Sequence, residues 1–424
     1  VLTGLVGAFA WAVHYTRDRL GLPLVLLAAL FWPSLEWIQA HLGDLAFPWL
    51  GLGTALAPFP RLAGAADLVG SRGLTVWIAA VNGLLADGVI RSRSGRPIRR
   101  VAAGLVVLLA APAAYGFWRA ATLELRPVAR VAVVQPNIPE EVKMDRAIAV
   151  DSSAASLTRL TRSLAGDAPD LVVWPEIALP ADLVGSPALT RLATRLSREV
   201  GAPIVAGAYG VDRDGDDVTA FNSAFLVDGS GIGPRYDKRR LVPFVERVPF
   251  IDPALLEGIT GELRYFGALG HGRSDRVLEI DDIGYGVLIC YESIFAPLSR
   301  RYRRQGADFL VNITNDAWYG RAEWYARTTA LWQHPAHMVL RAIETRTGVA
   351  RAANTGISMF IDPLGRPYRQ TRLFVPAVRT ATVYTTDAVP LFVRWGDWLA
   401  TLAVAVAVVV LVAGKGGRWG TGDG

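Results

Sequence analysis

Long apolar stretches dominate the first 118 residues, and one more lies near the C-terminus. Four have spanning or near-spanning length, at residues 22–40, 74–90, 101–118 and 394–413. Buried core helices could share this composition, but residues 101–118 include no charged side chain, which is typical of a membrane span. A hydrophobic share of 52% and a mean hydropathy of +0.30 also indicate that part of the chain lies in lipid. A fifth stretch, residues 1–14, looks cut short, and because the chain opens on Val1 we expect further sequence before it.

Arginines indicate which side of the membrane each connecting loop faces. Five of them lie in residues 91–100, "RSRSGRPIRR", between two predicted spans. Basic loops stay on the cytoplasmic side, and Arg17, Arg19 and the basic tail at 415–418 fit the same alternation. The net charge of +6 therefore reflects membrane topology rather than nucleic-acid binding. Residues 41–66 and 119–393 are expected on the extracytoplasmic face.

Between residues 129 and 386 the pattern changes to short β-rich runs that alternate with helical stretches. Typical runs are "RVAVVQ", "PIVAGAY", "YGVLIC" and "DFLVNIT", and their alternation with helices predicts an α/β domain. The chain then has three parts. We expect N-terminal transmembrane helices at 1–118, an extracytoplasmic α/β domain at 119–393, and a C-terminal transmembrane helix with a cytoplasmic tail at 394–424.

Cys290 is the only cysteine of the 424 residues. A lone thiol cannot form a disulfide within the chain, so it is a core residue, a metal ligand or a nucleophile. Glu176 ends "LVVWPE" and Lys238 lies in "RYDKRRLVPFVE", close to strand ends, where α/β domains bring distant side chains together. A thiol, a carboxylate base and a lysine that stabilises an oxyanion suffice for acyl transfer. Each residue alone fits an ordinary core or surface position equally well.

Five motifs resemble those of the nitrilase, or carbon-nitrogen hydrolase, superfamily. They are "VVWPEIALP", "YDKRRLVPFVERVPF", "LICYES", "VNITNDAWYG" and "RAANTGISMFIDPLGR". With the flanking membrane helices, the chain more narrowly resembles the apolipoprotein N-acyltransferases, membrane enzymes that complete bacterial lipoproteins. The likeness runs from "FPWLGLGTA" to the final span. It implies an α/β fold, with a nitrilase-like αββα sandwich and a transmembrane helical bundle.

The resemblance also implies roles for matching residues. Cys290 resembles the family's nucleophile, Glu176 its general base and Lys238 its oxyanion-stabilising lysine. Glu246 resembles a second, supporting carboxylate, and Tyr291 and Glu292 match residues beside the nucleophile. The backbone N–H of Tyr291 is a second candidate oxyanion donor.

A lipid or substrate entrance is expected near the apolar side chains of Met144, Phe47 and Trp49. Met144 stands where the family usually has tryptophan. A second departure from the family is Val245, which stands where glycine is usual. Phe47 and Trp49, in "FPWL", either anchor the chain at the membrane interface or belong to that entrance.

Metal chemistry is disfavoured by the sequence. His334 and His337 stand three residues apart in "WQHPAH", but Pro335 separates them and no third ligand is evident, so we expect a structural role. No P-loop, G-x-G-x-x-G or G-x-S-x-G motif is present, which argues against nucleotide binding and the usual serine hydrolases. We expect neither a metal nor an organic cofactor.

The reaction implied by the resemblance takes place in the cytoplasmic (inner) membrane of a bacterium. A phospholipid donates an acyl chain to the cysteine thiol, and the α-amine of an apolipoprotein's N-terminal diacylglyceryl-cysteine then accepts it. Two alternatives remain open at this stage. One is a membrane-anchored amidase or nitrilase that hydrolyses a small C–N substrate, and the other is a non-catalytic membrane scaffold.

Overall fold

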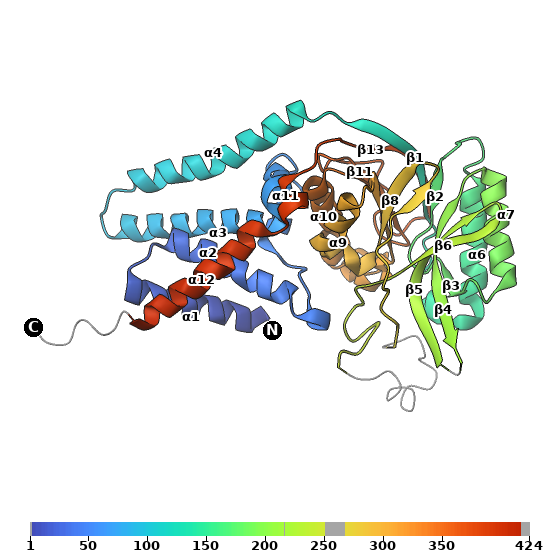
Figure 1. Ribbon diagram of the computed structural model, residues 1–424, viewed down its shortest axis with the longest axis horizontal. Coiled ribbons are helices and arrows are strands. Elements are labelled where there is room, and N and C mark those ends of the chain that lie inside the picture. Colours follow the sequence, from blue (N-terminus) through green and yellow to red (C-terminus); the bar gives the residue numbers. More distant parts are fainter. Residues whose placement is uncertain (1, 216, 251–267, 417–424) are drawn as a thin grey trace, which may run out of the picture. The chain divides into compact units, whose positions relative to one another are not determined.

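The structure is a computed structural model that describes residues 2–215, 217–250 and 268–416. The chain forms two compact units, one comprising Val1–Leu123 with Val389–Gly424 and the other Glu124–Ala388. The sequence places these boundaries at 118–119 and 393–394. Figure 1 shows the first unit as a set of long helices and the second as two sheets with helices outside them.

The described residues of the first unit form six α-helices. They are α1 (Leu2–Leu20), α2 (Leu24–Ala40), α3 (Ala66–Arg93), α4 (Arg99–Thr122), α11 (Leu391–Trp395) and α12 (Trp398–Gly416), with short 3₁₀ turns at Gly43–Leu45, Leu52–Leu56 and Ala63–Ala65. Within the described residues, three helical segments are long and apolar enough to cross a membrane, namely Ala63–Arg93, Arg99–Thr122 and Trp398–Lys415. They contain or largely overlap three of the predicted spans. The remaining predicted span, at 22–40, forms the shorter apolar helix α2. That this helix crosses the membrane stays a prediction.

Small residues allow the helices of this unit to approach closely. A Cβ added to Gly83 of α3 would lie 2.5 Å from the carbonyl oxygen of Leu24, and one added to Gly116 of α4 would overlap the carbonyl of Arg61. Such contacts are typical of membrane helices, where van der Waals packing replaces the hydrophobic effect. Val106 and Val107 of α4, at 66% and 64% exposure, present a face suited to lipid tails.

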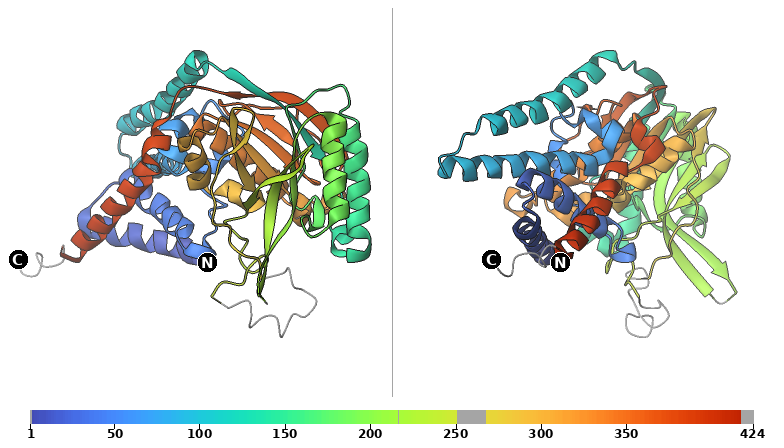
Figure 2. Two further views of the ribbon diagram at one scale, coloured as in Figure 1. Left: turned by 45° about the vertical axis from the view of Figure 1, so that its right-hand side comes forward. Right: turned by 60° about the vertical axis from the view of Figure 1, so that its left-hand side comes forward.

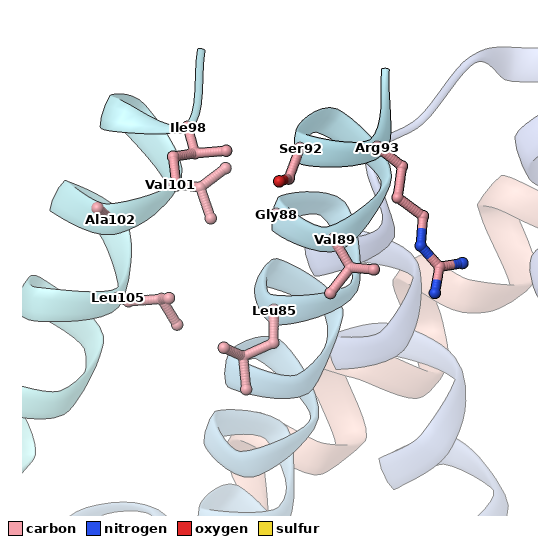
Figure 3. A pocket seen from close by; sticks show the side chains of 9 residues that line it. All are labelled: Leu85, Gly88, Val89, Ser92, Arg93, Ile98, Val101, Ala102 and Leu105. Atoms are coloured by element: carbon pink, nitrogen blue, oxygen red, sulfur yellow. The ribbon is translucent and has the colours of Figure 1, made fainter. Parts of the chain in front are cut away.

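A shallow groove of about 400 Å³ lies between α3 and α4 at the ends joined by the arginine loop. Figure 3 shows Leu85 and Val89 of α3 opposite Val101 and Leu105 of α4, whereas the Arg93 side chain points away from the facing helix. The groove therefore has an almost wholly apolar lining.

The first sheet of the α/β unit has the strand order β13-β1-β2-β4-β5-β6, and β3 pairs with β4. Its strands are β1 (Arg126–Gln135), β2 (Leu171–Val173), β3 (Leu179–Asp182), β4 (Ile204–Asp214), β5 (Asp217–Asp228), β6 (Gly231–Asp237) and β13 (Ala377–Thr385). β1, β2 and β4 run parallel, and the other neighbours on this path pair antiparallel. This mixture explains why β2 reads as a fully apolar run while β13 alternates.

The second sheet has the order β12-β11-β10-β9-β8-β7. Its strands are β7 (Leu278–Ile280), β8 (Ile283–Ile289), β9 (Phe309–Thr314), β10 (Gly348–Ala353), β11 (Met359–Ile361) and β12 (Pro367–Tyr368). The central strands β8, β9 and β10 are parallel. Almost all their residues are buried, as expected for strands covered on both faces.

Helices cover the outer face of each sheet, which gives four layers (Figures 1 and 2). The helices α6 (Arg146–Arg162) and α7 (Pro187–Val200) bury a leucine-rich face on the first sheet, and α9 (Ala296–Arg304) and α10 (Ala330–Thr345) lie on the second. Between the sheets, Gln135 at the end of β1 accepts hydrogen bonds from the hydroxyls of Ser358 and Thr371 at 2.7 and 2.8 Å. The nitrilase-like αββα sandwich predicted from the sequence is confirmed.

The arginine loop generates a prediction about topology. In a Cys290→Ala background, a cysteine introduced at exposed Ser94 should resist a membrane-impermeant thiol reagent in intact cells, because positive loops remain inside. A cysteine at exposed Ser230 in the α/β unit should react. Labelling both positions after cell lysis is the control for reactivity, and the reverse pattern in intact cells would contradict the orientation.

Candidate active site

A buried lysine lies between two carboxylates at the edge of the first sheet. Lys238 directly follows β6, and its ammonium lies 3.0 Å from Oε1 of Glu176 and 2.8 Å from Oε1 of Glu246. Lys238 is 1% exposed and Glu176 is 4% exposed. Buried charges persist only when they are paired and hydrogen-bonded, so these three side chains form one ionic cluster.

An asparagine completes this cluster. The side-chain amide of Asn222, on β5, donates to Oε1 of Glu176 at 2.8 Å and to Oε1 of Glu246 at 2.9 Å. Glu176 also accepts a hydrogen bond from the backbone N–H of Asn315 at 2.8 Å. Since Asn315 directly follows β9 of the second sheet, this contact links the two sheets at the site.

Lys143 fixes the turn that carries Glu176. Its ammonium, from the short helix α5 (Glu140–Met144), donates to the carbonyl oxygen of Ile177 at 3.0 Å. Ile177 has a φ of 43°, a left-handed conformation that a β-branched residue adopts only when its surroundings impose it. Burial lowers the pKa of Lys143 to about 8, against the attraction of Glu140 and Glu176. The hydrogen bond to the carbonyl helps to hold Glu176 in place.

Cys290 lies at a sharp turn, directly after β8 and at the first position of the 3₁₀ helix Cys290–Ile294. Its φ is 50°, again in the left-handed region, which costs a non-glycine residue roughly 1–2 kcal/mol. The turn leaves the thiol at the end of a central strand, under the electrostatic influence of both Glu176 and Lys238 and in hydrogen-bonding contact with Thr314. The structure thus brings together the three residues that the sequence singles out for acyl transfer.

The charges of this group favour a protonated thiol at rest. Burial and the nearby Glu176 carboxylate raise the pKa of Cys290, although Lys238 opposes them. Burial alone would also raise the pKa of Glu176, but Lys238 and the hydrogen-bond donors outweigh it and hold that pKa below its ordinary value. Burial would lower the pKa of Lys238, but the two carboxylates raise it well above its usual range. A neutral thiol therefore lies beside an ion pair.

Glu292 ties the cysteine turn to the loop after Lys238. Its carboxylate accepts hydrogen bonds from the Tyr236 hydroxyl at 2.8 Å and from the backbone N–H groups of Arg239 and Ile289 at 2.7 and 2.8 Å. Glu292 is fully buried, and this burial raises the pKa of its carboxyl against the effect of those donors. These contacts give Glu292 a role in positioning the cysteine turn. Tyr291 is also buried, and its aromatic ring packs against that of Phe295.

The expected entrance residues lie in different units. Phe47 and Trp49 stack at 5.8 Å in the helical unit, with Phe47 43% exposed and Trp49 buried. Met144, at the end of α5 in the α/β unit, is 55% exposed. Their shared entrance remains a prediction. Val245 does not have a positive φ, so a valine fits where the family usually has glycine.

Several polar residues of the site were not assigned a role from the sequence. They are Asn222, Thr314, Asn315, Asp316 and Arg351, all buried. His334 contacts Asp316 and the carbonyl oxygen of Cys290, in line with the structural role expected for it. The sequence does contain one indication of such a buried polar network. Asn312 is a polar residue inside the otherwise apolar strand "DFLVNIT", and buried polar groups require partners.

The fold and this arrangement of a thiol, a carboxylate and a lysine define a carbon-nitrogen hydrolase domain. The family model described as carbon-nitrogen hydrolase matches residues 130–388. The model described as apolipoprotein N-acyltransferase N-terminal domain matches residues 1–84. These matches cover most of both units.

Relatives agree with the family models. The chain is 36% identical over 409 residues to the apolipoprotein N-acyltransferase of Geobacter metallireducens, which covers 95% of this chain and 76% of that protein. It is 31% identical to the protein of the same name from Chlorobaculum tepidum, with 94% and 79% coverage. The chain therefore belongs to the apolipoprotein N-acyltransferase family.

Solved structures match the chain at lower identity. A CN-hydrolase superfamily protein of Xanthomonas campestris is 21% identical with a TM-score of 0.43, and the match covers 60% of this chain and 90% of that one. A Saccharomyces cerevisiae member of branch 10 of the nitrilase superfamily is 16% identical with a TM-score of 0.44, covering 66% and 95%.

The Glu292 contacts generate a prediction about stability. Glu292→Ala should lower the free energy of unfolding by about 3 kcal/mol or more, because it leaves several buried donors without an acceptor. The measurement is the thermal unfolding midpoint of the purified protein in detergent micelles. Glu279→Ala, the same substitution at an exposed position of β7, is the control and should leave the midpoint nearly unchanged. Equal midpoints for both variants would contradict the positioning role.

Proposed function

We propose that this enzyme transfers an acyl chain from a phospholipid to the α-amine of an N-terminal diacylglyceryl-cysteine, through a thioester on Cys290. The observation that carries the proposal is the convergence of Cys290 with the Glu176–Lys238 ion pair, although these residues lie 52 to 114 positions apart in the sequence. The family relatives support the substrate classes, since they are named apolipoprotein N-acyltransferases.

In the first half-reaction, the thiol attacks the ester carbonyl of the phospholipid. The S–H proton passes to Glu176 as the new S–C bond forms. The transfer is concerted with attack because the raised pKa of Cys290 and the lowered pKa of Glu176 disfavour a free thiolate at rest. Lys238 and the Tyr291 N–H stabilise the oxyanion. Glu176 then returns the proton to the leaving glycerol oxygen, and lysophospholipid departs.

In the second half-reaction, the acceptor amine attacks the thioester carbonyl. Glu176 takes a proton from the nitrogen as the C–N bond forms, the C–S bond breaks, and the proton returns to Cys290. The products are an amide and the original thiol, so no metal or redox partner enters the balance. Burial of the site limits hydrolysis of the thioester before an amine arrives. Both substrates lie at the membrane surface, which accounts for an α/β unit joined to membrane helices.

The first consequence concerns the intermediate. Protein mixed with an ester-linked phospholipid, without an acceptor, should gain one acyl mass on Cys290 that neutral hydroxylamine removes. A diacylglyceryl-cysteine peptide should then discharge it as an N-acyl product, whereas a small-substrate hydrolase would release free acid. Cys290→Ser should accumulate no comparable adduct, because a hydroxyl is much harder to deprotonate than a thiol. Intact-mass and peptide-mass measurements follow each step, and an adduct on another residue would refute the proposal.

The second consequence concerns the ion pair. Glu176→Gln keeps the shape but removes the base, so the rate of Cys290 acylation should fall by on the order of 10²-fold or more. Lys238→Met should lose a similar factor through the oxyanion. Because it also leaves two buried carboxylates unpaired, its unfolding midpoint must be measured in parallel. Glu279→Gln, at an exposed position, is the control. Near-native acylation in both site variants would mean that other residues carry the chemistry.

A further inference from the structure

His334 contacts the carbonyl of the cysteine turn, and its hydrogen-bond partners Cys290 and Asp316 are both buried. It belongs to α10 and is fully buried. Its Nε2 lies 3.1 Å from the carbonyl oxygen of Cys290, and its Nδ1 lies 2.8 Å from Oδ1 of Asp316. A carbonyl oxygen and an ionised carboxylate both only accept hydrogen bonds, so Nε2 donates a hydrogen bond to the carbonyl of Cys290 and Nδ1 donates one to Asp316.

The Cys290 carbonyl belongs to the same peptide group as the Tyr291 N–H, which is proposed to stabilise the oxyanion. The C=O of Cys290 and the N–H of Tyr291 are the two ends of a single planar peptide, and the described residues include no cis peptide bond. The C=O and N–H of a trans peptide point in opposite directions. A hydrogen bond that fixes the carbonyl direction therefore also fixes the direction of the Tyr291 N–H.

This peptide requires such a restraint. Cys290 has a left-handed φ of 50°, and strained conformations persist only when the surrounding structure imposes them. On one side, Glu292 accepts the hydrogen bond of the preceding Ile289 N–H at 2.8 Å. On the other side, His334 holds the carbonyl. The turn is thus restrained from both ends.

The network behind His334 keeps the ring in a fixed orientation. Asp316 accepts a hydrogen bond from the Thr314 hydroxyl at 3.0 Å and from the Arg351 guanidinium at 2.7 Å. Arg351 also donates to Oδ1 of Asn312. These residues are fully buried and come from β9, β10 and the turn after β9. A buried ion pair contributes little net stability compared with apolar packing, which favours a positioning role for this network.

Resting on the proposed function, we propose that His334 is a positioning residue that aims the Tyr291 N–H at the developing oxyanion, and that the Asp316–Arg351 pair holds the His334 ring for this purpose.

The test compares two reactions of Cys290 in the full-length protein in detergent micelles. Acylation by dioleoyl phosphatidylethanolamine passes through an oxyanion, whereas alkylation by iodoacetamide at a saturated carbon does not. His334→Leu, which removes the donor at similar bulk, should slow acylation at least 10-fold, since loss of a single oxyanion donor slows catalysis by 10² or more. It should change alkylation by less than about 3-fold. A merely structural role would slow both reactions together.

Two further variants make the test decisive. His334→Gln carries a side-chain N–H at nearly the position of Nε2, so it should recover most of the acylation rate. His337→Leu makes the same substitution one turn later in α10 at an equally buried position, and should leave acylation within about 3-fold of the parent protein.

Specific outcomes would overturn the inference. They are an unchanged acylation rate in His334→Leu, a parallel fall in alkylation, no recovery in His334→Gln, or an equal loss in His337→Leu. If the parent protein forms no acyl adduct on Cys290, the proposed function itself fails and this inference fails with it. If the parent protein acylates but the variants match it, only the role of His334 is refuted.

Discussion

The burial of one ammonium group between two carboxylates is the interaction on which the site depends. Lys238 is 1% exposed and pairs with Glu176 and Glu246 at 3.0 and 2.8 Å. Removal of one member of a buried pair typically costs about 3–5 kcal/mol, because it leaves the partner charge uncompensated. The loops after β2 and β6, and the loop that carries Glu246, are therefore held together by the same charges that the proposed chemistry uses.

The thiol is located by the second sheet, and so the site exists only once the two sheets have packed. Cys290 directly follows β8 of the second sheet, while Glu176 and Lys238 follow strands of the first sheet. The N–H of Asn315, just after β9, reaches across to Glu176 at 2.8 Å. Left-handed backbone at Ile177 and Cys290 lies beside these contacts, and the hydrogen bonds around each turn offset its strain.

Much of this architecture could be predicted from the sequence, because it depends on local patterns. Apolar runs indicated the membrane helices, and the alternation of β-rich runs with helices indicated an α/β domain. The sandwich itself was implied by the resemblance of the motifs to the nitrilase superfamily. The motifs around Glu176, Lys238 and Cys290 could be recognised because each is continuous in the chain. The contacts of Asn222 with Glu176 and Glu246, and of His334 with Cys290, could not be predicted in this way, since they join residues 24 to 46 positions apart. Periodicity carries no information about such contacts.

Under the proposed mechanism, the electrostatics also explain how the Cys290 thiol remains inert until substrate arrives. Glu176 is held ionised by Lys238, and the Cys290 thiol is kept protonated by burial and by that same carboxylate. A thiolate formed at rest would place a third negative charge near Glu176 and Glu246 with only Lys238 to balance them. An ester carbonyl changes this situation, because the negative charge moves to an oxygen that Lys238 and a backbone N–H can both stabilise. In the proposed mechanism, reactivity is thereby coupled to substrate binding, which suits a lone buried cysteine.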